Sequence, residues 1–376
     1  MEKKGSTSFS ISFFFFFLLT VVVSYSSLVA SQNHNITTVF TFDDSTLDPG
    51  NNNNIPTSFK SNHPPYGRDF NGGIATGRFT DGKLVTDMVV SSLGIKDFLP
   101  AYFEPKITNH DLLTGVSFAS AGSGLDDQTP DRGGVIHMST QLVKFQECLA
   151  RIQATVGDAS AAQIIQNAIF TIGAGTNDMI INYYDLPTRR LEFSPPAYHD
   201  LLLRKLETSV TITNYMFGIH SGLYKMGARK LIITGLPPIG CLPVQATVGS
   251  ITPGPDMLER ICEDQQNEDA QAYNIKLQGY IKRWQEKLSG SKIVYADIYN
   301  PLMDMIQNPS KYGSQETMRG CGGTGYVEVG GLCNNMMVVC SDPSKYIFFD
   351  AIHPTAAAYK HLANVILQTV LPSLGN

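Results

Sequence analysis

Short apolar runs alternate with longer amphipathic segments along most of this chain, and this alternation limits the folds that it can adopt. Segments rich in apolar residues that read as strands are 37–42, 167–175, the first part of 228–241 and 291–299. Apolar residues recur at helical spacing in 81–94, 139–157, 197–227, 254–290 and 355–371. Strands without a polar face are typical of a parallel sheet that helices cover on both sides. We therefore predict an α/β fold, a three-layer α/β/α sandwich with a mainly parallel sheet.

Three local expectations accompany this fold. The segment 114–124, "TGVSFASAGSG", reads as a strand that runs into a turn of small residues. Thr140 is expected to cap the helix that follows it. The stretch 49–77 is rich in glycine, asparagine and proline and has little periodicity, so we expect an ordered loop near a functional site.

The N-terminus has the pattern of a secretory signal. Two lysines precede the apolar run 11–23, and small residues follow it up to Ala30. The run is too short for a comfortable bilayer span. We predict a cleaved signal peptide at 1–30, a single domain over 31–376 and no stable membrane span after cleavage. The protein would then be extracellular, in the apoplast or cell wall of a plant. An uncleaved signal anchor is the alternative.

Secretion changes the interpretation of the cysteines. The chain has six cysteines, and an even number in an oxidising compartment indicates disulfides. Their spacing is not that of a zinc site. We expect one bond between Cys241 and Cys262, and a second within the group Cys321, Cys333 and Cys340.

Net charge and short motifs limit the classes of binding partner and suggest a glycosylation site and a salt bridge. The formal net charge is −5 and lysine and arginine do not cluster, which argues against nucleic-acid binding. The sequon at Asn35 is the expected glycosylation site. Arg78 in "GRFTDGK" is expected to form a structural salt bridge, with binding of an acidic group as the alternative.

Polar residues follow the ends of the predicted strands, where open parallel sheets bind their ligands. Ser45 follows the run 37–42, Gly122 lies in the turn after the next segment, and Asn177 follows 167–175. Asp350 and His353 follow "KYIFF" near the C-terminus. A serine hydroxyl becomes a nucleophile when a base takes its proton and an acid orients that base. An asparagine amide and a glycine N–H can stabilise an oxyanion.

Each of these residues also has a purely structural interpretation. Ser45 at a strand end can cap a helix by accepting from its first amides. Asp350 and His353 can be polar residues at a helix N-terminus. Asn177 and Gly122 both suit tight turns. The pattern "FTFDDS" also lacks the flanking glycines of the nucleophile elbow of α/β-hydrolases.

The motifs together, and in this order, resemble those of the plant-type GDSL esterase/lipase family of the SGNH hydrolase superfamily. The matching stretches are "FDDSTLDPGNN", "GVSFASAGSG", "GAGTNDM", "GLPPIGCLP" and "FDAIHPT". The resemblance extends from about Thr38 to Leu371. It implies a flavodoxin-like SGNH-hydrolase fold and a serine esterase or lipase that acts on an ester of a lipid or small metabolite.

The resemblance also implies a role for each candidate residue. Ser45 is the nucleophile, His353 is the base and Asp350 orients the base. The oxyanion hole consists of the Ser45 amide, the Gly122 amide and the Asn177 side chain. The acyl group passes to water through an acyl-enzyme, and neither a metal nor a cofactor is expected. The oligomeric state is not indicated.

Asp43 departs from the family pattern, because it stands where the family has glycine. A carboxylate that points into the site would repel the oxyanion, since two unit charges 4 Å apart interact by roughly 4 kcal/mol at an effective dielectric constant near 20. A carboxylate that points to solvent or to amides would matter little, and a required positive φ would strain the backbone. A catalytically weakened binding or signalling protein is therefore an alternative function. An acyltransferase that uses the same triad is another.

Overall fold

A parallel sheet of four strands forms the centre of the fold in the computed structural model, which describes residues 36–173, 175–211, 222–250 and 260–375. The strands lie in chain order and every neighbouring pair is parallel. They are β1 (Val39–Phe42), β2 (Ile169–Ile172), β3 (Lys230–Thr234) and β4 (Lys292–Ala296). The predicted α/β class and the predicted strands at these positions are confirmed. The expected signal peptide at 1–30 and the Asn35 sequon lie outside the described residues.

The segment after the first helices runs along the other edge of β1. Thr41 N donates to Val116 O (3.3 Å), and Phe118 N donates to Thr41 O (2.8 Å). Only isolated bridges form here, at Ser117, so the strand predicted in 114–124 is extended chain beside β1 rather than a regular strand. β1 thus lies between this segment and β2. The chain first adds a segment on one side of β1 and then crosses over to form β2 on the other side. Such a switch point is where α/β sheets bind their ligands.

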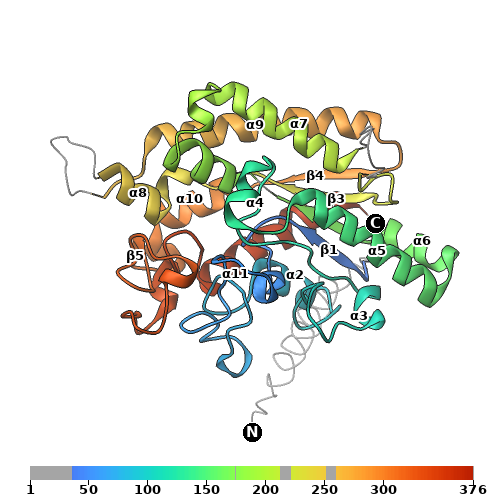
Figure 1. Ribbon diagram of the computed structural model, residues 1–376, viewed down its shortest axis with the longest axis horizontal. Helices are drawn as coiled ribbons and strands as arrows, with labels where there is room; N and C mark the ends of the chain where they lie inside the picture. The colour runs from blue at the N-terminus through green and yellow to red at the C-terminus, as the bar shows by residue number, and fades with distance from the viewer. Residues whose placement is uncertain (1–35, 174, 212–221, 251–259, 376) are drawn as a thin grey trace, which may run out of the picture. The chain divides into compact units, whose positions relative to one another are not determined.

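One face of the sheet is covered by α5 (Met138–Val156), α6 (Asp158–Asn167), α7 (Pro195–Val210) and α9 (Asp264–Lys287). α5 contacts α6 and α7, and α7 packs against α9 (Figure 1). Helices are predicted over 139–157, 197–227 and 254–290, and α5, α7 and α9 lie in these ranges. The second prediction is too long, because α7 ends at Val210 and residues 223–227 form turns; 212–221 and 251–259 lie outside the described residues.

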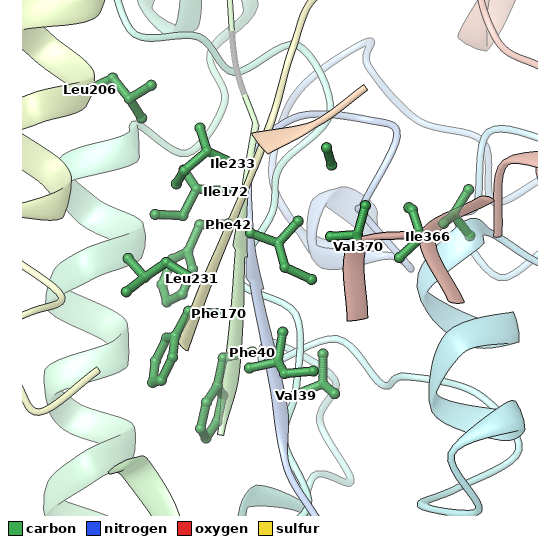
Figure 2. Close-up of a cluster of buried hydrophobic side chains, with 14 of the residues drawn as sticks. Val39, Phe40, Phe42, Phe170, Ile172, Leu206, Leu231, Ile233, Ile366 and Val370 are labelled. Carbon is green, nitrogen blue, oxygen red and sulfur yellow. The ribbon is translucent and has the colours of Figure 1, made fainter. Parts of the chain in front are cut away.

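The second helical layer is built from α2 (Val85–Ser92), α10 (Tyr299–Gln307) and α11 (Ala356–Val365). α11 contacts both of the others and continues as the π-helix η9 (Ile366–Val370). The strands send alternate side chains to the two layers. Figure 2 shows Phe40 and Phe170 on one side of the sheet and Ile366 and Val370 on the other.

The other described elements surround the sheet. A separate parallel pair joins β5 (Glu316–Gly320) to β6 (Tyr346–Phe348). The short helices are α3 (Asn109–Leu113), α4 (Gln128–Gly133) and α8 (Pro243–Ser250), and the π-helix η3 spans Asp178–Asp185. Within the described residues, no helix is both long enough and apolar enough to cross a bilayer.

The prediction that Thr140 caps the helix is wrong. α5 begins at Met138, and the residue before it, His137, has an extended backbone. Gln141 N donates to His137 O (2.9 Å), so the helix starts before Thr140 and places this residue inside the first turn. A cap at α11 does form, because Thr355 accepts from Ala358 N at 3.2 Å.

Both expected disulfides are present. Cys241 is bonded to Cys262, and Cys321 is bonded to Cys340. The remaining cysteines, Cys148 and Cys333, are buried free thiols. Burial raises the pKa of each thiol to about 12, so both are chemically inert at neutral pH.

The salt bridge expected at Arg78 is confirmed. Its Nε and Nη2 donate to the two carboxylate oxygens of Asp87 on α2, at 2.7 and 2.9 Å. Nη2 also donates to Leu99 O, at 2.9 Å. Because both charged side chains are buried, this bidentate pair fixes the loop that precedes α2.

Candidate active site

The chain turns sharply after β1 instead of entering a helix. Leu47 N donates to Asp44 O (3.2 Å), and Thr46 N and Oγ1 both donate to Asp44 Oδ1 (3.0 Å each). Asp44 therefore holds the turn, and Ser45 does not cap a helix. The Ser45 hydroxyl lies instead 2.7 Å from His353 Nε2.

The imidazole of His353 is held from its other side by Asp350. Nδ1 lies 2.7 Å from Asp350 Oδ2 and 2.9 Å from Oδ1. The backbone amides of Ile352 and His353 also donate to Asp350 Oδ1, at 2.8 and 2.7 Å. These bonds turn the chain so that Nε2 faces the serine. The exposed fractions are 6% for Ser45, 2% for His353 and 0% for Asp350, so little water competes for these contacts.

Tyr66 completes the environment of Asp350, and the sequence interpretation missed it. Its hydroxyl donates to Asp350 Oδ2 (2.7 Å) and accepts from Gly330 N (2.8 Å). Burial raises the pKa of Tyr66 well above its usual range, which keeps the hydroxyl protonated. The Phe79 ring packs against His353, with 4.7 Å between ring centroids. No spacing in the sequence links either aromatic residue to the C-terminal motif.

Asn177 joins the loop of Ser45 to the loop of Gly122. Its Nδ2 donates to Ser123 O (2.9 Å) and to Asp44 Oδ2 (3.3 Å). Across the described residues, the backbone N–H groups of Ser45 and Gly122 donate to no protein acceptor. The site therefore offers two free amides and one side-chain amide close to the serine.

The position of Gly122 requires glycine. Its φ is +83°, and a Cβ there would lie 2.8 Å from Cδ1 of Phe59. A larger residue would meet both backbone strain and the aromatic ring.

The asparagine-rich loop after the turn holds these parts together. Asp48 accepts from Gly50 N and Asn51 N through Oδ1 and from Ala121 N through Oδ2. Burial raises the pKa of Asp48 to about 6. Asn52 Nδ2 donates to Ala121 O, at 2.8 Å. The loop that sequence composition placed near a site thus supports the backbone just before Gly122.

Asp43 is buried against the sheet, in none of the orientations expected from sequence. Its N and O pair with the Gln141 side chain, at 3.1 and 3.0 Å. A Cβ on Gly173 would lie 1.8 Å from Asp43 Oδ2, so the carboxyl occupies the space beyond the end of β2. Its Oδ1 has no partner among the described residues. The side chain is 4% exposed.

The carboxyl of Asp43 favours its neutral form. Burial is the largest cause that holds its pKa well above the usual range, and the carboxylate of Asp44 is the second. Burial also raises the pKa of Asp44 itself. The anionic repulsion expected for an inward-pointing Asp43 therefore does not describe this side chain.

The arrangement can perform nucleophilic catalysis. A hydroxyl in contact with an imidazole, which is oriented in turn by a carboxylate, is the geometry that activates a serine. Within the described part of the chain, no cluster of His, Cys, Asp and Glu side chains is arranged to hold a metal ion.

Comparison with known proteins finds relatives along most of the chain. The sequence model described as GDSL-like Lipase/Acylhydrolase matches residues 39–366. The chain is 50% identical over 345 residues to GDSL esterase/lipase At2g40250 of Arabidopsis thaliana, covering 92% of each chain. It is 44% identical over 330 residues to GDSL esterase/lipase At2g31540 of the same plant, covering 87% of this chain and 88% of the relative.

We predict that Asp43→Asn raises stability relative to the wild type, and that the gain grows as the pH rises from about 4. An unfolded aspartate loses its proton near pH 4, whereas the raised pKa lets the folded state keep it. The folded wild type then binds one proton more than the unfolded chain. Its free energy of unfolding falls, relative to the variant, by up to about 1.4 kcal/mol per pH unit.

Urea unfolding of both proteins between pH 4 and pH 8 measures this difference. Asp97→Asn, at an exposed position, is the matched control for loss of one carboxylate. A stability difference for Asp43→Asn that does not change with pH would contradict the prediction.

Proposed function

The chain belongs to the GDSL-like lipase/acylhydrolase family and is a carboxylic ester hydrolase, and on this basis we propose that it is a secreted serine esterase or lipase that acts on esters of a lipid or small metabolite. The observation that carries the mechanism is the series of contacts from Ser45 Oγ to His353 Nε2 and from His353 Nδ1 to Asp350. The following steps are this proposal.

His353 Nε2 takes the proton of Ser45 as Oγ attacks the carbonyl carbon of the ester. The imidazolium that forms is stabilised by Asp350, which remains ionised. Collapse of the tetrahedral intermediate breaks the bond to the alcohol oxygen, and Nε2 returns its proton to that oxygen. The alcohol leaves, and the acyl group remains on Oγ.

The same groups then hydrolyse the acyl-enzyme. A water molecule gives one proton to His353 Nε2 as its oxygen attacks the acyl carbon. When the bond to Ser45 Oγ breaks, the proton returns to the serine and the carboxylic acid is released. Each proton that leaves a nucleophile is carried by one imidazole nitrogen, so the cycle balances.

The oxyanion accepts hydrogen bonds from the backbone amides of Ser45 and Gly122 and from the side-chain amide of Asn177. Both hydrogens of the Asn177 amide already have acceptors, and the bond to Asp44 is the longer one, at 3.3 Å. When substrate is present, the Asn177 amide replaces its hydrogen bond to Asp44 with a hydrogen bond to the oxyanion. A donor of this kind contributes about 10²–10³ in rate.

Secretion is part of the proposal. Its support is the pair of disulfides, Cys241–Cys262 and Cys321–Cys340. Such bonds persist in oxidising compartments and are rare where thiols are kept reduced.

We predict that Ser45→Ala abolishes ester hydrolysis, with a fall in kcat of about 10⁴-fold or more because the nucleophile is removed. The purified secreted protein is assayed with p-nitrophenyl acetate and butyrate. Labelling by a fluorophosphonate probe reports the activated serine independently of substrate, and Ser341→Ala, which alters an exposed serine, is the control. Equal turnover by the wild type and by Ser45→Ala would contradict the proposed mechanism.

We predict that Tyr66→Phe lowers kcat about 10- to 100-fold with little change in KM. The substitution removes the hydrogen bond to Asp350, and a bond to a charged group contributes about 1.5–3 kcal/mol. Tyr66 acts through Asp350, so its effect is on positioning, and the pH profile of kcat shifts as well. Tyr224→Phe removes a hydroxyl that donates to Ser289 O and serves as the control. A kcat and pH profile equal to those of wild type would show that Tyr66 is only a packing residue.

The weakened, non-catalytic alternative rests on Asp43, and the neutral, buried carboxyl described above removes its electrostatic basis. We predict that Asp43→Gly, which restores the family residue, changes kcat/KM for p-nitrophenyl butyrate by less than about tenfold. The Asp43→Asn protein is the matched control for loss of the acid alone. A rise of a hundredfold or more after Asp43→Gly would instead support a weakened hydrolase.

A further inference from the structure

The segment that the Cys321–Cys340 disulfide closes, residues 321–340, exposes a cluster of apolar side chains. We call it the disulfide loop, and it lies at the edge of the domain beside β5 (Figure 1). Thirteen large hydrophobic side chains are exposed in the described part of the chain, and six of them belong to this loop: Tyr326, Val327, Leu332, Met336, Met337 and Val338. Single exposed apolar residues are normal on a protein surface, whereas a cluster of them indicates a binding surface.

The loop is anchored from inside, which holds these side chains outward. The disulfide joins its ends, and Gly323 N donates to Val338 O at 2.9 Å. Val339 packs against the buried cluster that includes Tyr66. Successive side chains of an extended chain point to opposite sides, so Val338 faces away from this cluster. Met336 and Val338 thus project into solvent, with exposed fractions of 87% and 83%.

The disulfide loop exposes no charged side chain, although charged residues make up 16% of the whole chain. Its one charged residue, Glu328, is buried. The Glu328 carboxylate accepts hydrogen bonds from the Thr324 hydroxyl and from the backbone N–H groups of residues 324–327. Moving a charge out of water costs free energy, and this loop can enter an apolar phase without moving one.

The charged side chains that border the loop nearly cancel. Two arginines contact it, because Arg68 donates to Cys340 O at 2.8 Å and the Arg260 guanidinium lies 4.2 Å from the centre of the Tyr326 ring. The remaining charges close to the loop or to these arginines are two cations and three acids: Arg319, Lys345, Asp69, Glu316 and Asp342. The border therefore offers little net attraction to an anionic surface.

The base of the loop is attached to the proposed catalytic acid. Gly322 N donates to Phe349 O, at 2.8 Å, and Phe349 directly precedes Asp350. Gly330 N donates to the Tyr66 hydroxyl, which donates in turn to Asp350 Oδ2. A surface bound to the outside of the loop is therefore held beside the candidate site.

We propose that the disulfide loop docks the protein reversibly on a lipid surface without net charge, with Met336 and Val338 inserted at the boundary between headgroups and acyl chains. The inference rests on the proposed function, because insoluble ester-bearing lipids gather at such a surface. A fluid lipid phase accepts projecting aliphatic side chains without a matching pocket, whereas a protein partner would have to supply one. The absence of exposed charge on the loop also fits an apolar phase.

The binding test is co-sedimentation with vesicles of dialkyl phosphatidylcholine, a lipid without a carboxylic ester. The double variant Met336→Asp, Val338→Asp removes two apolar contacts and adds two charges, so its partition coefficient is expected to fall at least about tenfold. Leu191→Asp with Ile275→Asp makes the same change at two exposed positions outside the loop and is expected to bind like wild type. Leu332→Asp replaces the loop variant if that protein does not fold.

Salt separates apolar docking from electrostatic attraction. Raising the NaCl concentration from about 0.1 M to about 0.5 M shortens the range of charge interactions. Binding of the wild type is expected to change by less than about twofold, because apolar contact drives it. Loss of binding at the higher salt concentration would overturn the proposed role of the apolar side chains.

Hydrolysis separates docking from chemistry. With p-nitrophenyl acetate in solution, the loop variant is expected to match the wild type, because the substrate needs no surface. With emulsified tributyrin at a limiting amount of interface, its rate is expected to fall in proportion to the lost binding, at least about fivefold. Equal rates of wild type and loop variant on the emulsion would contradict the inference.

The remaining outcomes assign the surface. No vesicle binding by the wild type, or equal binding by the wild type and the loop variant, would overturn the inference. A wild-type dimer that the loop substitutions dissociate without lipid, seen by sedimentation velocity, would overturn it too, because the loop would then join two copies of the chain. Failure of the proposed function has another signature, which is no Ser45-dependent turnover of p-nitrophenyl acetate while vesicle binding persists.

Discussion

Buried backbone amides beyond the strand ends must find acceptors, and this constraint shapes the site. The loops that meet at the end of β1 have no sheet to pair with, so side chains supply the bonds. Asp48 takes three amides from two loops, and Gln141 pairs with both backbone groups of Asp43. Asp178 accepts from the amides of Leu125 and Asp126. The Ser45 and Gly122 amides stand out because this network leaves them free.

Local periodicity made the sheet and helices predictable from sequence, and parallel topology made the site predictable. The carboxyl ends of parallel strands share one edge, so the sequence alone predicts that Ser45, Asn177 and His353 meet there. Contacts between loops carry no such period. Tyr66 lies 284 residues from Asp350 in the chain, and neither spacing nor composition connects them. The prediction that Thr140 caps a helix is wrong because the first residue of a helix depends on the backbone conformation before it. The apolar pattern carries no information about that conformation.

Asp43 departs from the family pattern, and the fold accommodates its side chain in a buried space. Its direction depends on Gly173, where the missing side chain leaves room for a carboxyl at the end of β2. No reading of the local sequence around Ser45 contains that information. The cost is an acid buried without a partner for Oδ1.

The contact between Ser45 and His353 joins residues that are 308 positions apart. Proteins are synthesised from the N-terminus, so Ser45, the proposed nucleophile, emerges among the first parts of the domain, and His353, its proposed base, emerges among the last. An incomplete chain carries the serine in a turn without the imidazole that activates it. On the proposed mechanism, hydrolytic activity begins only after the C-terminal segment has docked, so turnover by a single molecule reports that almost the entire domain has folded.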